Sequence, residues 1–302
     1  MKQMVILSGK GGTGKTTVTA ALAHLASQEA DIVMADADVD AANLELVLSP
    51  QVQEGGGFTG GGLAIIDPEL CTACGICEEI CRFEAIIPGD EAYSVDELGC
   101  EGCGACSYAC PLEAIEIRKQ LDGKWFRSQA CYGPLFHARL FAARENSGKL
   151  VTLVKDKARK LALEQGADLL LVDGPPGIGC PVIAAVSGMD LTLLVTEPTV
   201  SAGHDLRRIV GVTHHFGIPA LACINKWDVN PTRAREMAVW CEEQRVPVVG
   251  QIPFDQVVTR AMVQGRPVTA YTDGPVTEAL RAIWEEVKEH LLSDGTGAAK
   301  EM

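Results

Sequence analysis

The sequence contains no long apolar segment and is poor in positive charge. Its 302 residues include 26 Lys and Arg but 40 Asp and Glu, which gives a formal net charge of −14 at pH 7. Without a run of about 18 apolar residues, no helix is expected to cross a membrane. The excess of negative charge argues against general binding to nucleic acid or to anionic membranes. We therefore expect neither nucleic acid nor a membrane among the partners.

We also expect no export signal, because the first apolar run begins at Met4 and leaves no room for one. A cytoplasmic location follows from this. Eight of the 12 cysteines are clustered with metal-ligand spacing, and in that reducing compartment iron–sulfur ligation is expected rather than a disulfide framework. The length allows one large domain, or a large and a small one.

The motif that organises the chain lies at residues 8–17, between an apolar run typical of a buried strand and an Ala- and Leu-rich segment typical of a helix. It matches the phosphate-binding pattern G-x-x-x-x-G-K-[ST]. Glycines let backbone N–H groups converge on phosphate oxygens, and the helix N-terminus adds positive potential. We expect Lys15 to reach the β- and γ-phosphates and Thr16 to bind Mg²⁺. The expected nucleotide-binding residues of this loop are Gly9, Lys10, Gly11, Gly12, Thr13, Gly14, Lys15, Thr16 and Thr17.

A second lysine, Lys10, directly follows Gly9. A loop with the order Gly-Lys-Gly-Gly-x-Gly-Lys-Thr resembles the deviant Walker A box of the MinD, ParA and nitrogenase-iron-protein ATPases. The resemblance implies ATP or ADP with Mg²⁺ as ligands, and ATP hydrolysis as the activity. It also implies that Lys10 crosses a dimer interface to the partner's nucleotide, so that a homodimer forms on nucleotide binding. A solvated loop lysine is the alternative.

Acidic residues follow one of the expected strands, at residues 32–35. They are Asp36, Asp38 and Asp40, and they lie where α/β sheets place ligands. This segment resembles switch I of the same ATPases, which makes Asp38 the candidate to position the attacking water or to hold Mg²⁺ through water. A solvated acidic loop is the alternative interpretation.

A further acid, Asp173, ends the apolar strand expected at residues 167–173, which is the layout of a Walker B motif. The next four residues resemble switch II of the family. The resemblance implies that Asp173 binds Mg²⁺ through water and that Gly177 offers its backbone N–H to the γ-phosphate. Asn225 resembles the base-contacting residue of the family. Because it opens an Asn-Lys-x-Asp pattern that also resembles the guanine motif of GTPases, ATP is expected but GTP stays open.

Eight cysteines form two runs with the same spacing, offset by 29 residues, and Glu-Ala-Ile at 84–86 recurs at 113–115. This internal duplication resembles the two-cluster bacterial ferredoxin module, in which the fourth cysteine of each run ligates the other cluster. The resemblance assigns one 4Fe–4S cluster to Cys71, Cys74, Cys77 and Cys110. It assigns the other to Cys100, Cys103, Cys106 and Cys81. Arg82 stands where the second run has Pro111, a departure that removes no ligand. A zinc ribbon, which needs two Cys-x-x-Cys pairs, is the alternative.

Outside the cysteine segment, strands and helices alternate. Strands are expected at residues 4–7, 32–35, 167–173, 191–195, 220–224 and 246–252, and helices at 18–26, 155–165, 204–216 and 276–292. The pattern predicts an α/β fold, a mostly parallel P-loop NTPase sheet covered by helices, with an inserted bacterial-ferredoxin-like α+β domain. Residues 1–54 and 123–302 are expected to form the ATPase domain and residues 55–122 the insert. Residues 51–62, with six glycines, are expected to be a linker.

Nearly the whole chain resembles MinD/Mrp-superfamily P-loop ATPases with an inserted ferredoxin domain, a group that includes components of orange-protein complexes. The leading hypothesis is an ATPase that uses Lys10, Lys15 and Asp38 and gates electron transfer between unknown protein partners by changing dimer geometry. The second is a carrier or assembly factor for iron–sulfur or other metal clusters. The late Cys-x-x-Cys pair of such scaffolds is missing, since Cys223 and Cys241 are isolated. The third is a MinD-like spatial organiser, whose membrane version is disfavoured by an acidic terminal helix.

Cys180 suggests a third cluster. It lies seven residues after Asp173, a spacing also found in the nitrogenase iron protein, where that cysteine ligates a cluster shared by two subunits. A symmetric bridging cluster needs two cysteines from each chain, and Cys131 is the only free cysteine between the insert and the Walker B acid. The hypothesis is that Cys180 and Cys131 of both subunits converge near a dimer axis. A buried, small apolar role for Cys180 is the alternative.

Overall fold

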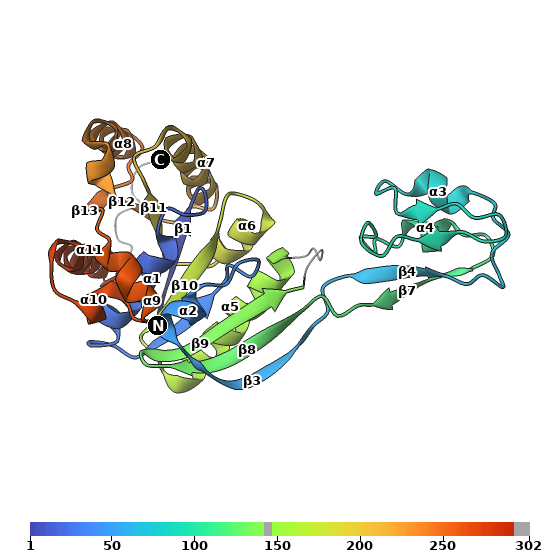
Figure 1. Ribbon diagram of the computed structural model, residues 1–302, viewed down its shortest axis with the longest axis horizontal. Helices are drawn as coiled ribbons and strands as arrows, with labels where there is room; N and C mark the ends of the chain where they lie inside the picture. The colour runs from blue at the N-terminus through green and yellow to red at the C-terminus, as the bar shows by residue number, and fades with distance from the viewer. Residues whose placement is uncertain (142–146, 293–302) are drawn as a thin grey trace, which may run out of the picture.

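The computed structural model describes residues 1–141 and 147–292. Most of them build a nine-stranded sheet in the order β13-β12-β11-β1-β10-β2-β9-β8-β3 (Figure 1). The seven strands from β13 to β9 are parallel to one another, and β8 is antiparallel to both β9 and β3. The predicted α/β fold with a mostly parallel sheet is therefore confirmed.

Six of the sheet strands, β1, β2, β10, β11, β12 and β13, lie close to the predicted positions, whereas β3, β8 and β9 were not predicted. The sheet strands are β1 (Lys2–Ser8), β2 (Ile32–Asp36), β3 (Gln51–Phe58), β8 (Gly123–Ala130), β9 (Gly133–Leu140), β10 (Leu169–Pro176), β11 (Leu191–Thr196), β12 (Ala220–Asn225) and β13 (Val248–Ile252). In β1, Val5 and Leu7 face one hydrophobic core, and Met4 and Ile6 face the other. Strand side chains alternate between the two faces of a sheet, so each face has a core of its own.

Helices cover both faces of the sheet. One layer consists of α5 (Ser147–Gln165), α6 (Cys180–Val186), α7 (Val200–His215) and α8 (Pro231–Glu243). The other consists of α1 (Lys15–Ala26), α2 (Leu44–Leu48), α9 (Val257–Val263), α10 (Val268–Tyr271) and α11 (Pro275–Leu292). The apolar side of α11 is buried in this second core. Within the described ranges, no helix is both long and apolar enough to cross a bilayer.

The predicted linker at residues 51–62 is wrong in its first part, because residues 51–58 form β3 at the edge of the sheet. Its glycines lie opposite aromatic residues of β8, with Gly55 across from Phe126 and Gly56 across from Trp125. A Cβ on Gly56 would be 2.8 Å from Trp125 Nε1, so the indole covers the glycine. Aromatic cover stabilises glycines in a strand, and composition alone does not reveal it.

Residues 62–119 form a small lobe that stands away from the main sheet (Figure 1). Its elements are the antiparallel pair β4 (Gly62–Ile66) and β7 (Ile115–Lys119), a second pair β5 (Ile86–Ile87) and β6 (Ser94–Val95), and the short helices α3 (Ile76–Ile80) and α4 (Ala105–Ala109). The lobe has a separate core of Ala64, Cys77, Ile86, Cys106 and Ile115. We call residues 62–119 the cysteine lobe.

The sequence duplication recurs in the backbone of the cysteine lobe. Helices α3 and α4 each follow a left-handed glycine, Gly75 (φ 83°) and Gly104 (φ 81°). Glu84 and Glu113 also share a positive φ, 52° and 53°. Non-glycine residues adopt this conformation only rarely. The coincidence at equivalent positions indicates two copies of one folding unit.

Gly102 sets how closely the second cysteine loop approaches β4. It has a φ of 61°, and a Cβ would lie 2.0 Å from the backbone O of Gly62. Gly102→Ala is expected to loosen the lobe, because Gly62 cannot move away without disturbing its pairing with Lys119. Limited trypsin digestion followed by mass spectrometry should show cleavage at the exposed Arg118.

The matched control is Gly104→Ala, which also has a positive φ but meets no atom closer than 4.0 Å. It carries only the cost of a left-handed alanine, about 1–2 kcal/mol. Overpacking adds about 1–3 kcal/mol in Gly102→Ala, so its lobe should be cleaved roughly 10-fold faster than that of the control. Equal cleavage rates would contradict the close contact.

Candidate functional site

The loop of residues 9–14 joins β1 to α1 at the carboxyl edge of the parallel sheet. Gly12 (φ 80°) and Gly14 (φ 95°) adopt left-handed conformations that favour glycine. A Cβ on Gly14 would lie 2.2 Å from Asn225 Nδ2. This close approach lets Asn225 donate a hydrogen bond of 2.7 Å to the carbonyl O of Thr13. The end of β12 therefore helps to hold the shape of the loop.

Acidic side chains and hydroxyls surround the buried Lys15. Its Nζ lies 3.1 Å from Asp173 Oδ1 and 3.6 Å from Asp38 Oδ2. Thr16 and Thr19 donate hydrogen bonds of 2.7 Å and 2.8 Å to the two oxygens of Asp173. Burial lowers the pKa of Lys15, but the surrounding carboxylates raise it above its ordinary value. The structure thus brings Lys15, Thr16, Asp38 and Asp173 together as a charged, hydrogen-bonded cluster.

Asp36 lies behind this cluster and is completely buried. Its carboxyl group accepts hydrogen bonds from the backbone N–H groups of Leu44 (3.0 Å) and Asp38 (3.1 Å). Burial and the neighbouring Asp173 raise the pKa of Asp36 to about 8, so the group is mostly protonated at pH 7. It fixes the Asp38 segment to the start of α2. Sequence reasoning did not find this structural role.

A cavity of about 990 Å³ adjoins the cluster. Polar loop residues form one side of it, and apolar residues of α2, α9 and the segment before α9 form another. The lining includes Gly11, Gly12, Gly14, Lys15, Thr16, Thr17, Asp38, Asp40, Asn225, Lys226, Phe254 and Met262. Phosphate-binding backbone beside an apolar wall is the combination that a nucleotide requires. Gly9 lies against α7, where a Cβ would be 2.4 Å from Asp205 Cβ.

Lys10 does not join the cluster around Lys15. Its Nζ lies 2.8 Å from Glu197 Oε1 and donates hydrogen bonds to Thr199 (3.3 Å) and Ser201 (3.2 Å). Glu197 also pairs with Lys226 at 3.1 Å. Burial raises the pKa of Glu197, but the two lysines lower it by a larger amount. The net pKa is below the ordinary value, so the carboxylate stays charged. Sequence reasoning missed Glu197, although its place just after β11, at the ligand edge of the sheet, was a signal.

Two groups with an expected ligand role make contacts inside the protein. The N–H of Gly177, expected to face the γ-phosphate, donates a hydrogen bond of 3.0 Å to the carbonyl O of Ser8. Asp228, the last residue of the Asn-Lys-x-Asp pattern, accepts a hydrogen bond of 2.7 Å from the N–H of Phe254. The Asp228 carboxylate is therefore engaged with the turn that leads to α9.

Two small cavities in the cysteine lobe are each lined by four cysteines. One contains Cys71, Cys74, Cys77 and Cys110, and the other contains Cys81, Cys100, Cys103 and Cys106. The fourth cysteine of each run thus faces the cavity of the other run. The backbone N–H of Ala114 donates a hydrogen bond of 3.4 Å to Cys110 Sγ. Across residues 1–141 and 147–292, no three Cys, His, Asp or Glu side chains are arranged to hold a single metal ion.

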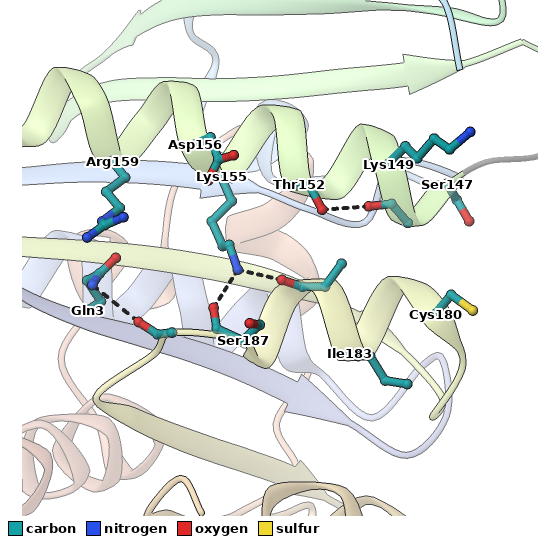
Figure 2. A pocket seen from close by; sticks show the side chains of 13 residues that line it. Gln3, Ser147, Lys149, Thr152, Lys155, Asp156, Arg159, Cys180, Ile183 and Ser187 are labelled. Atoms are coloured by element: carbon teal, nitrogen blue, oxygen red, sulfur yellow. Dashed lines mark hydrogen bonds between the residues drawn. The ribbon is translucent and has the colours of Figure 1, made fainter. Parts of the chain in front are cut away.

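A second large cavity, of about 910 Å³, lies between α5 and α6 (Figure 2). Lys155 reaches from α5 to α6, where it donates hydrogen bonds to the carbonyl O atoms of Ala184 and Ser187. Burial lowers the pKa of Lys155. Cys180 begins α6 at one end of this cavity, and its side chain is exposed.

Cys131 lies far from Cys180 in the fold. It occupies the turn between β8 and β9 and lines a cavity with Ile32, at the start of β2. Cys180 follows the carboxyl end of β10, which is parallel to β2. The two cysteines therefore lie at opposite edges of the sheet. The structure does not bring the predicted Cys131–Cys180 pair together within one chain.

Comparison with known proteins relates this geometry to a family. A family model described as the CobQ/CobB/MinD/ParA nucleotide binding domain matches residues 4–268. An uncharacterized protein of Methanocaldococcus jannaschii is 32% identical over 96% of this chain and 97% of its own length. A cytosolic Fe-S cluster assembly factor Nubp1 homolog of Drosophila willistoni is 29% identical over 40% of this chain and 46% of its own length.

Among solved structures, the septum site-determining protein MinD of Pyrococcus horikoshii, complexed with Mg-ADP, has a TM-score of 0.59. It is 20% identical, and the match covers 95% of this chain and 96% of the MinD chain, which establishes a common fold. The match to the family model covers the phosphate-binding loop, the acidic cluster and Asn225. The chain belongs to the CobQ/CobB/MinD/ParA nucleotide-binding domain family.

Proposed function

We propose that this chain is a cytoplasmic ATP-hydrolysing iron–sulfur protein in which nucleotide gates electron transfer through two 4Fe–4S clusters. The cysteine lobe would be the inserted ferredoxin-like domain, within the predicted range 55–122, whose first residues, 55–58, belong to β3 of the main sheet. Residues 1–54 and 123–302 would form the ATPase domain, of which 142–146 and 293–302 lie outside the described residues. The observation that carries the proposal is a pair of four-cysteine cavities in a chain that also has a complete phosphate-binding loop.

The nucleotide half of the proposal assigns a role to each member of the cluster. Lys15, which lies between Asp173 and Asp38, would bind the β- and γ-phosphates. Thr16 and Asp173, already hydrogen-bonded to each other, would hold Mg²⁺. Asp38 would position water for in-line attack on the γ-phosphate. ATP is favoured over GTP, because the Asp228 carboxylate that a guanine motif would use is engaged with the backbone of Phe254.

The cysteine half of the proposal depends on donor chemistry. Each cavity offers four sulfur donors, three from one run and one from the other. Zinc with bonds of about 2.3 Å would require four sulfurs within about 4 Å of one another. The cysteines of the described chain are not arranged to hold a single ion, whereas a four-iron cluster spans a wider space between its ligands. When bound, each cluster would supply a one-electron redox centre.

Dimerisation is the third part of the proposal. Lys10 would contact the nucleotide of the partner subunit, as the deviant Walker A resemblance implies. In the structure its ammonium group is paired with Glu197 of its own chain. A contact in trans therefore requires Lys10 to exchange this carboxylate for a phosphate, which makes Glu197 a competitor that holds Lys10 in place within the single subunit.

An iron–sulfur carrier or assembly factor is the second candidate function. The partial similarity to the Drosophila willistoni assembly factor favours it. A transfer assay separates the two candidates, since a carrier would lose cluster iron to an apo-acceptor protein and an electron donor would keep it. A membrane-bound organiser is disfavoured, because the apolar side of α11 is buried in the protein core. Partners for the redox role would be found by anaerobic pull-down, followed by reduction of the captured protein with and without ATP.

The first prediction concerns iron. Anaerobically purified protein should contain about eight iron and eight acid-labile sulfide atoms per chain. Cys71→Ser and Cys110→Ser should perturb the same cluster, and Cys81→Ser the other, because the cavities combine cysteines of both runs. Iron and sulfide analysis with electron paramagnetic resonance of the reduced protein checks this. Cys241→Ser, at a buried and isolated cysteine, is the control. Stoichiometric zinc without sulfide would contradict the assignment.

The second prediction separates the two loop lysines. Lys15→Ala should weaken ATP binding by roughly 10- to 100-fold, because a charged hydrogen-bond donor to phosphate is lost. Lys10→Ala should keep binding nearly intact but lower the hydrolysis rate by about 1000-fold or more and abolish ATP-dependent dimerisation. Calorimetry, phosphate release and analytical ultracentrifugation measure the three effects. Lys160→Ala, an exposed lysine on α5, is the control. Wild-type hydrolysis by Lys10→Ala would refute the trans role.

A further inference from the structure

The carboxyl end of β9 touches both the nucleotide site and the stem of the cysteine lobe. The N–H of Leu140 donates a hydrogen bond of 3.2 Å to the carbonyl O of Val39, which directly follows Asp38. The N–H of the next residue, Phe141, donates a hydrogen bond of 2.8 Å to the carbonyl O of Asp122. Two consecutive residues thus connect the Asp38 segment to the point where the chain returns from the lobe to the main sheet.

Asp122 holds the stem of the lobe together. Only 4% of the residue is exposed, and its Oδ2 accepts hydrogen bonds from the N–H groups of Gly60 (2.7 Å) and Gly61 (2.8 Å). Its own N–H donates to the carbonyl O of Phe58 (2.8 Å). The stem consists of the connections β3–β4 and β7–β8, which run side by side (Figure 1). Because glycine has little conformational preference, the carboxylate of Asp122 determines the path of the chain there.

A second contact joins the nucleotide site to β9 through α2. Asp36 binds the N–H of Leu44 at the start of this helix. The next residue, Glu45, lies 3.0 Å from Nδ1 of His137 on β9 and also pairs with Arg139. His137 is buried and makes a hydrogen bond of 2.8 Å with Ser128 on β8. Movement of the Asp38 segment would therefore act on β9 at two separate places.

We propose that the Asp38 segment, the end of β9 and Asp122 form a link through which phosphate binding sets the orientation of the cysteine lobe, with Asp122 as the positioning residue. A phosphate group at the loop competes with Asp38 for the charge of Lys15, which is 3.6 Å away. Asp38 then changes its contacts, and Val39, its neighbour, carries the change to Leu140. Such coupling requires an element with two arrangements, and the proposal assigns this role to the Asp38 segment.

The link rests on the nucleotide site of the proposed function but not on iron in the lobe. It gives the cysteine lobe a response to nucleotide within a single subunit, in addition to any change in dimer geometry. The ligand that would act on the link is a magnesium nucleoside triphosphate at the phosphate-binding loop. The lobe responds as a body, because its stem is clamped by Asp122 rather than joined through a free linker.

Hydrogen–deuterium exchange of the full chain tests the link, with and without Mg²⁺ and the non-hydrolysable analogue AMPPNP. In the wild type, the analogue should change exchange at Gly60, Gly61 and Leu140. Asp122→Ala should raise exchange at Gly60 and Gly61 by about 10-fold or more, because two hydrogen bonds to a charged acceptor are lost. In this variant the two glycines should no longer respond to AMPPNP, while calorimetry shows unchanged binding of the analogue.

Asp122→Asn is the conservative variant, since its amide oxygen can still accept a hydrogen bond, and it should restore part of the response. Asp90→Ala, an exposed aspartate of the lobe, should behave as wild type. Small-angle scattering is measured in a Lys10→Ala background, in which nucleotide should not cause dimerisation. It should show an AMPPNP-dependent change in the radius of gyration, and none when Asp122→Ala is added. The proposal is overturned if AMPPNP binds without altering exchange at Gly60 and Gly61, or if Asp122→Ala keeps the full response. Absence of iron would count against the redox role alone.

Discussion

The ionic cluster around Lys15 is the constraint on which the nucleotide site depends. Burying charged groups is costly unless each is paired and hydrogen-bonded. Here Lys15 pairs with both Asp173 and Asp38, while Thr19 also donates to Oδ1 of Asp173 and Thr16 donates to Oδ2. Asp36, the third acid, avoids the cost of burying a charge differently, because its raised pKa keeps the carboxyl group largely uncharged. These contacts join the ends of β1, β2 and β10, so the carboxyl edge of the sheet is held by charge as well as by packing.

The cysteine lobe is stabilised by different means. Its buried core has five members, and two of them are cysteines. A unit of this size buries too little apolar surface to be stable by packing alone and usually needs a metal or another cross-link. In the proposed function, cluster binding by the cysteines that line its two cavities would therefore also stabilise the fold of the lobe. The main sheet, with a large core on each face, has no such requirement.

Patterns of neighbouring residues in the sequence predicted the structural features that depend on neighbouring residues. Apolar runs located the parallel strands except β9, and carboxyl-edge placement predicted that Lys15, Asp38 and Asp173 would meet. Contacts between distant segments were not predictable in this way. The glycines of β3 are explained by aromatic residues about 70 positions later, and the Lys10–Glu197 pair spans 187 positions. The separation of Cys131 and Cys180 within the chain was not predictable either, because spacing along the chain does not show at which end of the strands a residue lies.

The register between β3 and β8 also shows where the cysteine lobe could be removed from the main sheet. Phe58 and Gly123 are directly opposite each other at the end of this antiparallel pair. Everything between them therefore occupies the tip of what would otherwise be a plain β-hairpin, which a two-residue turn could close. The lobe is an insertion at the tip of a hairpin, and gain or loss of it would leave the order of the nine sheet strands unchanged. Evolution or protein engineering could exchange this module, provided that the replacement supplies its own clamp at the position of Asp122.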